Sequence, residues 1–321
     1  MNVPNAPSLI LEDRDCPLGC FRDDDFVLKG RDRLHNLPGD FTVVRCRTCG
    51  LLRTNPRPTL ATIGSYYPEQ YSPFEGTKIR EASSPGFSPR LKKSIQKIFR
   101  FNTMVLPPQP PGRLLEVGCA SGSFLHHMAQ GGWDVEGVEP SKAAAQNTRR
   151  IGYRVFEGSI ESKPETTVLF DLIVGWMVLE HLHEPTATLR KFRSWLKQDG
   201  WLVLSVPDAG GMEFRWFKNR WYALQLPNHL YHFTPQMIRL VLRKTGWKVE
   251  RIFHQRILTS LIASFGYFLS DKGVGPNIAQ IFIRFPQRSG LFHYFLYPLA
   301  FLLSYWKQTG RMTIWARKAH D

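Results

Sequence analysis

The clearest pattern in the chain is an apolar run that ends in a glycine-rich turn. Leu114, Leu115 and Val117 precede the turn, which runs from Gly118 to Gly122, and the helix-like segment FLHHMA follows it. This order predicts a buried strand, a tight turn and a helix start. The two glycines lack a Cβ, so the backbone can bend sharply and a ligand can approach the free N–H groups of the helix. The segment therefore predicts a nucleotide-binding turn.

Apolar runs and helical segments alternate along the rest of the chain. The segment VEGVE predicts a second strand that ends at Glu139, and residues 141–151 have the pattern of a helix. Further strands are expected at residues 153–156, 170–174, 247–254 and 312–317. Strands that alternate with helices are typical of an α/β fold.

Two carboxylates indicate which ligand the turn suits. Glu116 lies two residues before the first glycine, and Glu139 stands where a carboxylate can accept both ribose hydroxyl hydrogens. A dinucleotide site usually has a further glycine where this chain has Ala120 and Ser121. Glu116 would repel a pyrophosphate but would attract a cation, such as an α-amino group or a sulfonium. The turn therefore favours a positively charged nucleoside.

Four motifs in order make this interpretation specific. The segments EVGCASG, GVEPS, FDLIVGWMVLEHL and LKQDGWLVLSVP resemble the consecutive motifs of class I S-adenosylmethionine-dependent methyltransferases, over residues 112–208. The resemblance implies a Rossmann-like α/β fold with a mostly parallel seven-stranded sheet and an antiparallel last strand. It also implies S-adenosylmethionine as cofactor. The residues expected to contact it are Glu116, Gly118, Cys119, Ala120, Gly122, Glu139, Pro140, Ser159, Ile160, Trp176, Met177 and Tyr71.

Methyl transfer to a hydroxyl or an enolisable carbon also requires removal of a proton, and histidine suits that role. The segment VLEHL, which contains His181, resembles the branch of the family that methylates oxygen and carbon in small molecules. The segment PNHLYHFT resembles a motif of deoxysugar C-methyltransferases in which the corresponding histidine, here His229, is the general base. Asn228 replaces the glutamate of that motif. The alternative is that His229 and His232 only anchor a turn.

The N-terminal cysteines form two close pairs, Cys16 with Cys20 and Cys46 with Cys49. Four thiolates in two such turns fit tetrahedral zinc, Zn²⁺, and a site with four protein ligands is structural. Reduced cysteines without metal, or a redox pair, are the alternatives. The sequence therefore predicts a small zinc-ribbon-like module.

The segment after the cysteines, with Asn-Pro-Arg-Pro and then Tyr-Tyr, resembles the N-terminal module of bacterial methyltransferases that act on sugars and cell-surface glycans. Tyr66, Tyr67 and Tyr71 would then form a lid over the methyl donor. The alternative is a proline-rich connector whose tyrosines pack on the main domain.

We expect three regions: a zinc-ribbon-like module at 1–55, a linker with lid helices at 56–111, and the methyltransferase domain at 112–321. Within the linker, residues 81–89 have a flexible composition and residues 90–101 predict a basic amphipathic helix. A helical insertion, 257–310, precedes the last strand and contains two strongly apolar parts, neither long enough for a comfortable membrane span. It would be an interfacial helical pair, a lid or a dimer contact.

The formal net charge of +15 is concentrated late in the chain. From Gly210 onward there are 16 Lys and Arg residues against 4 Asp and Glu. Such a lobe attracts polyanions, including an anionic membrane surface, unless it is simply a solvated face. The first residues lack the pattern of a signal peptide, so we expect a cytoplasmic protein, either free or peripheral on the inner face of the membrane.

The leading hypothesis is methyl transfer to a sugar, a glycan precursor or another small metabolite. RNA methylation is a second hypothesis, although long apolar runs interrupt the basic lobe and nucleic acid is not the expected partner. A non-catalytic scaffold that binds the same cofactor is a third. Acceptor pockets in this fold are built from variable lobes, so the sequence leaves the acceptor and the oligomeric state open.

Overall fold

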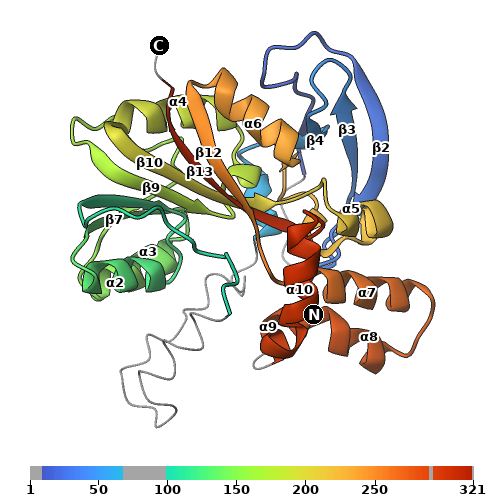
Figure 1. Ribbon diagram of the computed structural model, residues 1–321. Helices are drawn as coiled ribbons and strands as arrows, with labels where there is room; N and C mark the ends of the chain where they lie inside the picture. The colour runs from blue at the N-terminus through green and yellow to red at the C-terminus, as the bar shows by residue number, and fades with distance from the viewer. Residues whose placement is uncertain (1–8, 68–98, 289–291, 320–321) are drawn as a thin grey trace.

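A seven-stranded sheet forms the centre of the molecule (Figure 1). The structure is a computed structural model that describes residues 9–67, 99–288 and 292–319. The strand order is β12-β13-β10-β9-β6-β7-β8. In chain order these strands are β6 (Arg113–Val117), β7 (Asp134–Glu139), β8 (Arg154–Glu157), β9 (Phe170–Trp176), β10 (Leu196–Pro207), β12 (Trp247–His254) and β13 (Arg311–Lys318).

Helices cover both faces of this sheet (Figure 1). One layer contains α2 (Ser123–Gln130) and α3 (Lys142–Arg150), and the other contains α4 (Pro185–Trp195) and α6 (Pro235–Lys244). Side chains alternate along a strand, so neighbouring residues of β6 enter different cores. Leu114 packs with the α2 and α3 layer, whereas Leu115 packs with the α4 and α6 layer. Both leucines are fully buried.

The fold class predicted from the sequence is confirmed. Strands β6, β7, β8, β9 and β10 are parallel to one another, while β13 is antiparallel to both β10 and β12. The expected helix at 141–151 is α3, and the Ser141 hydroxyl caps its first turn by accepting from the Ala144 amide. The third strand, β8, begins one residue later than expected and ends one residue later.

The N-terminal residues form a second, smaller sheet that includes a strand from the main domain. Its order is β11-β4-β3-β2, from β2 (Asp24–Arg31), β3 (Asp40–Cys46), β4 (Leu52–Thr54) and β11 (Tyr231–His232). The short strands β1 (Leu11–Glu12) and β5 (Arg57–Pro58) pair beside it, before the 3-10 helix η1 (Ile63–Tyr66). The two parts of the chain therefore share backbone hydrogen bonds.

The segment between β12 and β13 is helical, with α7 (Thr259–Asp271), α8 (Pro276–Ile283), α9 (Phe285–Arg288) and α10 (Phe292–Tyr305). Among the described residues, no helix combines the length and the apolar character needed to cross a membrane. After β10 the chain forms α5 (Met212–Phe217) and two 3-10 turns, η3 (Lys218–Arg220) and η4 (Tyr222–Leu224). The predicted linker at 81–89 and most of the predicted helix at 90–101 lie outside the described residues.

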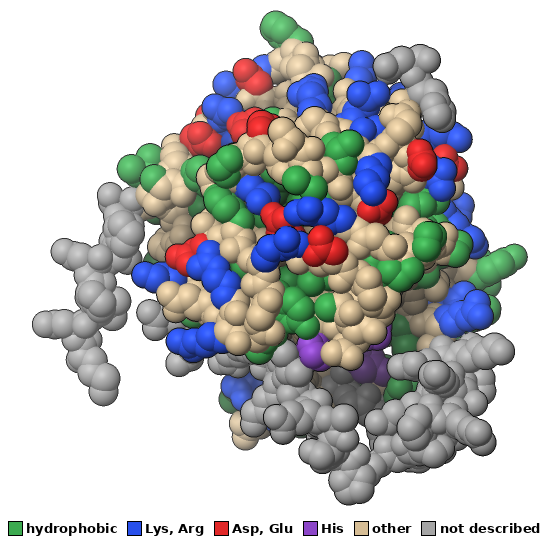
Figure 2. All heavy atoms as spheres, turned by 90° about the vertical axis from the view of Figure 1, so that its left-hand side faces the viewer, with side chains coloured by type: hydrophobic (Ala, Val, Ile, Leu, Met, Phe, Trp, Pro, Cys, Tyr) green, Lys and Arg blue, Asp and Glu red, His purple; other side chains and the backbone are tan. Residues whose placement is uncertain are grey.

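Charges of both signs are mixed on the face around β7 and α2 (Figure 2). Several of them form ion pairs, including Arg149 with Glu157 at 3.0 Å and Lys197 with Asp171 at 2.9 Å. Each exposed pair contributes little stability. This face therefore offers no continuous basic track for a polyanion.

We predict that Thr54→Val destabilises the protein by about 1–3 kcal/mol, because it leaves a buried carbonyl without its donor. The Thr54 hydroxyl donates to the His229 carbonyl oxygen at 2.7 Å, and both residues are buried. Urea unfolding measures the change. Thr54→Ser is the matched control, since it keeps the hydroxyl, and equal stability of the two variants would contradict the prediction.

Candidate active site

The turn between β6 and α2 can be built only with glycine at both ends. Gly118 has φ +71° and Gly122 has φ +72°, a region that residues with a Cβ rarely adopt. A Cβ on Gly118 would lie 2.8 Å from Val178 Cγ2, and one on Gly122 would lie 2.6 Å from Thr148 Cγ2. The Gly118 amide also donates to the Val138 carbonyl at 2.8 Å, which joins the turn to β7.

Glu139 is hydrogen-bonded to the backbone of this turn. It ends β7, is 2% exposed, and its carboxylate accepts from the backbone amides of Ala120 and Ser141, both at 2.8 Å. Burial raises the pKa of Glu139, while these two amides oppose the rise. Pro140, the next residue, is exposed. The structure thus brings Glu139 against the glycine turn, as the sequence predicts.

Glu116 lies beneath the turn. It shares a strand face with Leu114, so its side chain enters the layer of α2, where it is 3% exposed. Burial and the charge of Glu139 raise the pKa of Glu116 well above its ordinary value, against a hydrogen bond from the Leu125 amide near the start of α2. One carboxylate oxygen, Oε2, has no hydrogen-bond partner in the described structure. A cation at the turn would relieve the repulsion between the two acids.

The end of β9 lies beside the end of β6, its neighbour in the sheet. The Trp176 ring makes an edge contact with Phe124 of α2, at 5.3 Å between centroids, and its buried Nε1 has no hydrogen-bond partner among the described residues. Met177 follows with φ +57° and lies 3.7 Å, Sδ to Oγ, from Ser205. The two residues therefore flank the turn, where the resemblance implies contact with the donor.

The other residues predicted to contact the methyl donor do not lie together. Cys119 is buried in the turn and packs on the β7 backbone, since a Cβ on Gly137 would lie 2.6 Å from its sulfur. Ser159 Oγ accepts from the Ser162 amide at 3.2 Å in the turn after β8, and Ile160 is buried in the core. Tyr71 lies outside the described residues.

These observations fit a cationic nucleoside such as S-adenosylmethionine. Two buried polar atoms beside the turn, Glu116 Oε2 and Trp176 Nε1, lack hydrogen-bond partners in the described structure. Buried polar groups without partners are rare, so a bound molecule is a natural explanation for both.

A second group of polar side chains lies just after Val178, the residue that a Cβ on Gly118 would meet. Glu180, His181 and His229 each place one atom that can bind a metal, a carboxylate oxygen or a ring nitrogen, within 4.8 Å of the other two. Glu180 and His181 belong to η2 (Leu179–His181), and His229 follows η4. The two imidazole rings meet edge to face, with centroids 4.6 Å apart. The structure therefore brings the two predicted catalytic histidines together across 48 residues of sequence.

Backbone carbonyls orient both rings. His229 Nδ1 lies 2.8 Å from the Ala223 carbonyl oxygen, and His181 Nδ1 lies 3.0 Å from the Asn228 carbonyl oxygen. Because a carbonyl only accepts, each Nδ1 carries the proton and each Nε2 keeps its lone pair. Burial lowers the pKa of His181 to about 4 and that of His229 well below its ordinary value. Both rings are therefore neutral at neutral pH.

Sequence reasoning missed Glu180 as a site residue. It is fully buried, and neither carboxylate oxygen has a hydrogen-bond partner among the described residues. Burial raises its pKa to about 8, and its own backbone amide and the charge of Arg311 only partly oppose this. The available signal was its position beside His181 in VLEHL.

His232 has a structural role in this arrangement. It lies in β11, is buried, and its Nε2 is 3.3 Å from the Thr54 hydroxyl. Asn228 donates from its side-chain amide to the Tyr66 carbonyl at 2.9 Å, and the Tyr67 hydroxyl lies 2.8 Å from His181 Nδ1. The two described tyrosines of the predicted lid therefore contact the histidine segment directly.

The four N-terminal cysteines form one cluster, with their sulfur atoms within 4.8 Å of one another. Cys16 and Cys46 are buried against the core below α6. Burial raises the pKa of Cys16 to about 11 and also raises that of Cys49, whereas at Cys46 hydrogen bonds from the Cys49 and Thr48 amides outweigh burial and lower the pKa. Amides that reach a sulfur favour its thiolate, the form that binds metal. The donor set fits a tetrahedral Zn²⁺ ion.

Comparison with known proteins identifies the family. Residues 89–252, just over half of the chain, match the family model described as a methyltransferase domain. The chain belongs to this family. It is an S-adenosylmethionine-dependent methyltransferase, as the motifs predict.

Two relatives illustrate the range of the methyltransferase's neighbours. The ubiquinone biosynthesis O-methyltransferase of Cereibacter sphaeroides (strain ATCC 17025 / ATH 2.4.3) is 25% identical over 187 residues, which cover 54% of this chain and 73% of the relative. The tRNA U34 carboxymethyltransferase of Proteus mirabilis (strain HI4320) is 30% identical over 171 residues. That match covers 49% of this chain and about half, 52%, of the relative.

Solved structures with similar chains include two S-adenosylmethionine-dependent methyltransferases. The one from Mesorhizobium loti is 18% identical, with a TM-score of 0.45, and the match covers 66% of this chain and 94% of the other. The one from Archaeoglobus fulgidus is 16% identical, with a TM-score of 0.43, and the match covers 71% and 93%.

We predict that Gly118→Ala weakens binding of S-adenosylhomocysteine about tenfold or more. The new Cβ would meet Val178, and the left-handed backbone costs a residue with a side chain about 1–2 kcal/mol. Calorimetry on the folded variant measures the affinity. Gly64→Ala is the control, because a Cβ there has nothing within 4 Å, and unchanged affinity in Gly118→Ala would contradict the prediction.

Proposed function

We propose that the protein transfers a methyl group to a hydroxyl, or to an enolisable carbon, of a sugar, a glycan precursor or another small metabolite. The observation that carries the proposal is the polar cluster of Glu180, His181 and His229 beside the donor turn. Relatives named as O-methyltransferases support an oxygen acceptor. The segment around His229 supports a sugar.

Val178 links the cluster to the donor turn. Val178 would touch a Cβ on Gly118, and Glu180 is two residues further along the same segment. S-adenosylmethionine supplies an electrophilic methyl group when bound. The turn and Glu139 hold the donor side, and the cluster faces the acceptor, so the two reactants meet in a fixed orientation.

We assign removal of the acceptor proton to this cluster, with His229 Nε2 as the base. Nε2 is available because Nδ1 is engaged with the Ala223 carbonyl. A neutral buried imidazole has its lone pair free at neutral pH. His181, which is partly exposed, is the second candidate and lies closer to solvent.

The cysteine cluster is assigned a structural zinc ion. Four sulfur ligands leave no open position, so the ion would stabilise the N-terminal sheet. Because this sheet includes β11, its stability also supports the position of His229, two residues before β11.

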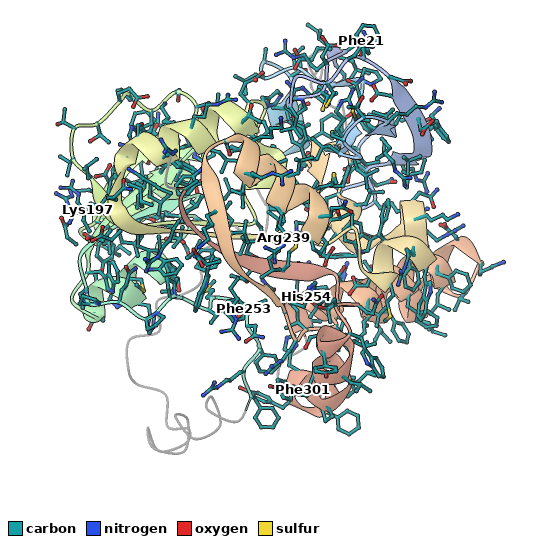
Figure 3. The ribbon with its side chains drawn as sticks, turned by 45° about the horizontal axis from the view of Figure 1, so that its top comes forward. Phe21, Lys197, Arg239, Phe253, His254 and Phe301 are labelled. Carbon is teal, nitrogen blue, oxygen red and sulfur yellow. The ribbon has the colours of Figure 1, made fainter. Side chains whose placement is uncertain are left out.

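We also propose that the helical insertion touches an anionic membrane surface. Large apolar side chains on α8 and α10 are exposed, among them Ile281 at 68% and Phe295 at 76%. Phe301 also projects from α10 (Figure 3), with the Arg256 guanidinium 4.5 Å from its ring centroid. Apolar surface beside cations is typical of a monotopic membrane contact. Such a contact suits a lipid-linked acceptor.

We predict that His229→Ala lowers the rate of methyl transfer by about 10²–10⁴-fold, the usual contribution of a general base. The assay follows methyl label from the donor into separated sugar, lipid-linked and RNA fractions of cells that lack the protein. Affinity for S-adenosylhomocysteine should not change, and exposed His127→Ala is the control.

Two outcomes of this assay would overturn the proposal. Label that enters mainly RNA would favour an RNA methyltransferase over the proposed acceptor class. Failure of the wild-type protein to bind S-adenosylhomocysteine would favour a scaffold.

We predict that the protein floats with vesicles of anionic lipid at low salt and separates from them at high salt, because salt screens the attraction. Replacing Phe295 and Ile281 by Ser should reduce flotation, since both side chains are mostly exposed and would enter the interface. Wild-type protein that stays wholly in the soluble fraction at low salt would contradict the membrane contact.

A further inference from the structure

The acceptor-side cluster has an unusual feature for a buried site. Glu180 is fully buried with both carboxylate oxygens unpartnered among the described residues. The charge of Arg311 acts on Glu180, but the two form no ion pair among the described residues. An unpaired buried charge costs several kcal/mol, so a carboxyl group in this position either stays protonated or has a bound cation.

The two histidines beside it have the orientation of metal ligands. Ligating histidines almost always donate their other ring N–H to a carbonyl or a carboxylate, which fixes the ring and directs the free nitrogen at the ion. His181 and His229 both have this arrangement, with the Asn228 and Ala223 carbonyl oxygens as the outer acceptors.

We propose that Glu180, His181 and His229 bind a divalent transition-metal ion. One carboxylate and two imidazoles form a donor set that suits Zn²⁺, Mn²⁺ or Fe²⁺ better than Ca²⁺, which prefers oxygen ligands alone. Ligand distances of about 2.1 Å place tetrahedral donors roughly 3.4 Å apart. The donor atoms here lie within 4.8 Å, so the side chains would close slightly around the ion.

Three protein ligands leave at least one coordination position open, as in catalytic metal sites. His181 is the partly exposed member of the group, so we place the open position beside His181. The Tyr67 hydroxyl lies 2.8 Å from Nδ1 of the same ring and, with the Asn228 carbonyl, holds the edge that does not face the ion. An acceptor hydroxyl that enters beside His181 becomes the next ligand.

The proposal rests on the proposed function and specifies how the cluster activates the acceptor. The ion lowers the pKa of a bound hydroxyl, its O–H bond ionises, and the proton passes to water. The resulting alkoxide forms a C–O bond with the methyl group while the C–S bond breaks and its electron pair remains on sulfur. In the metal-bound protein His229 is a ligand, and it is a base only in the metal-free protein.

The test is metal stoichiometry on the full-length folded protein after chelation and readdition of Co²⁺. The wild type should bind one equivalent at the cysteine cluster, with the intense absorption of a thiolate–cobalt bond, and a second equivalent without it. Glu180→Gln should lose only the second equivalent and keep the first. Glu250→Gln, the same chemical change on an exposed face of β12, is the matched control and should retain both.

Thermal unfolding gives an independent readout. Metal-free Glu180→Gln should be at least as stable as metal-free wild type, because the variant removes a carboxylate that has no partner. Only the wild type and Glu250→Gln should gain additional stability from the second equivalent of Co²⁺. Equal stoichiometry and equal metal-induced stabilisation in Glu180→Gln and wild type would overturn the metal site.

That failure can be distinguished from failure of the proposed function. If the second equivalent never binds but His229→Ala still loses methyl transfer, the cluster works by base catalysis and only the metal proposal is wrong. If the second equivalent binds and no methyl acceptor is found among sugars or metabolites, the metal site stands and the acceptor class is wrong.

Discussion

The bend between β6 and α2 is the constraint on which the rest of the site depends. Gly118 and Gly122 adopt left-handed backbone angles, and a Cβ on either would collide with a neighbouring side chain, Val178 or Thr148. The position of Val178 next to Gly118 places the segment that carries Glu180 beside the donor turn. A change in the bend would therefore move the donor and the acceptor-side cluster together.

The N-terminal sheet completes the acceptor side and is not a separate appendage. Strand β4 pairs with β11, the Thr54 hydroxyl supports the His229 carbonyl, and Tyr67 contacts His181. Each contact joins residues more than 100 positions apart, so the histidines are positioned only when both parts are folded. Any metal at the cysteine cluster would act on the site through this shared backbone.

Local pattern predicted much of the fold. Apolar runs and turn residues that are close in sequence predicted the glycine turn and the individual strands, whereas the mostly parallel sheet with an antiparallel last strand was implied by the resemblance of four motifs to a known family. The pairing of β11 with β4 did not follow, because two residues, Tyr231 and His232, carry no periodic signal. The proposed boundaries at 55 and 111 stay predictions.

The site was also predictable only in part, because many of its contacts join segments without a periodic sequence pattern. Motif spacing located Glu139 and His229, but their contacts with Ala120 and Ala223 depend on how distant or irregular segments meet. Glu180 shows the limit most clearly, since a carboxylate beside a histidine is unremarkable until burial removes its water. The roles of Glu139 and His229 in binding the methyl donor and activating the acceptor stay predictions.

The buried acids of this protein separate into structural and functional groups by their partners. Glu213 accepts from the Trp221 indole at 3.1 Å and from the Gly310 amide at 3.0 Å, and Glu139 accepts from two amides. Glu116 retains one unpartnered oxygen in the described structure, and Glu180 retains two. A fold that satisfies the first two acids would gain stability by satisfying the others as well. Asp208 Oδ2 also lacks a hydrogen-bond partner among the described residues, but it lies 3.3 Å from His254 Nδ1. The unpartnered oxygens of Glu116 and Glu180 instead flank the proposed donor and acceptor positions, where bound ligands would supply their partners.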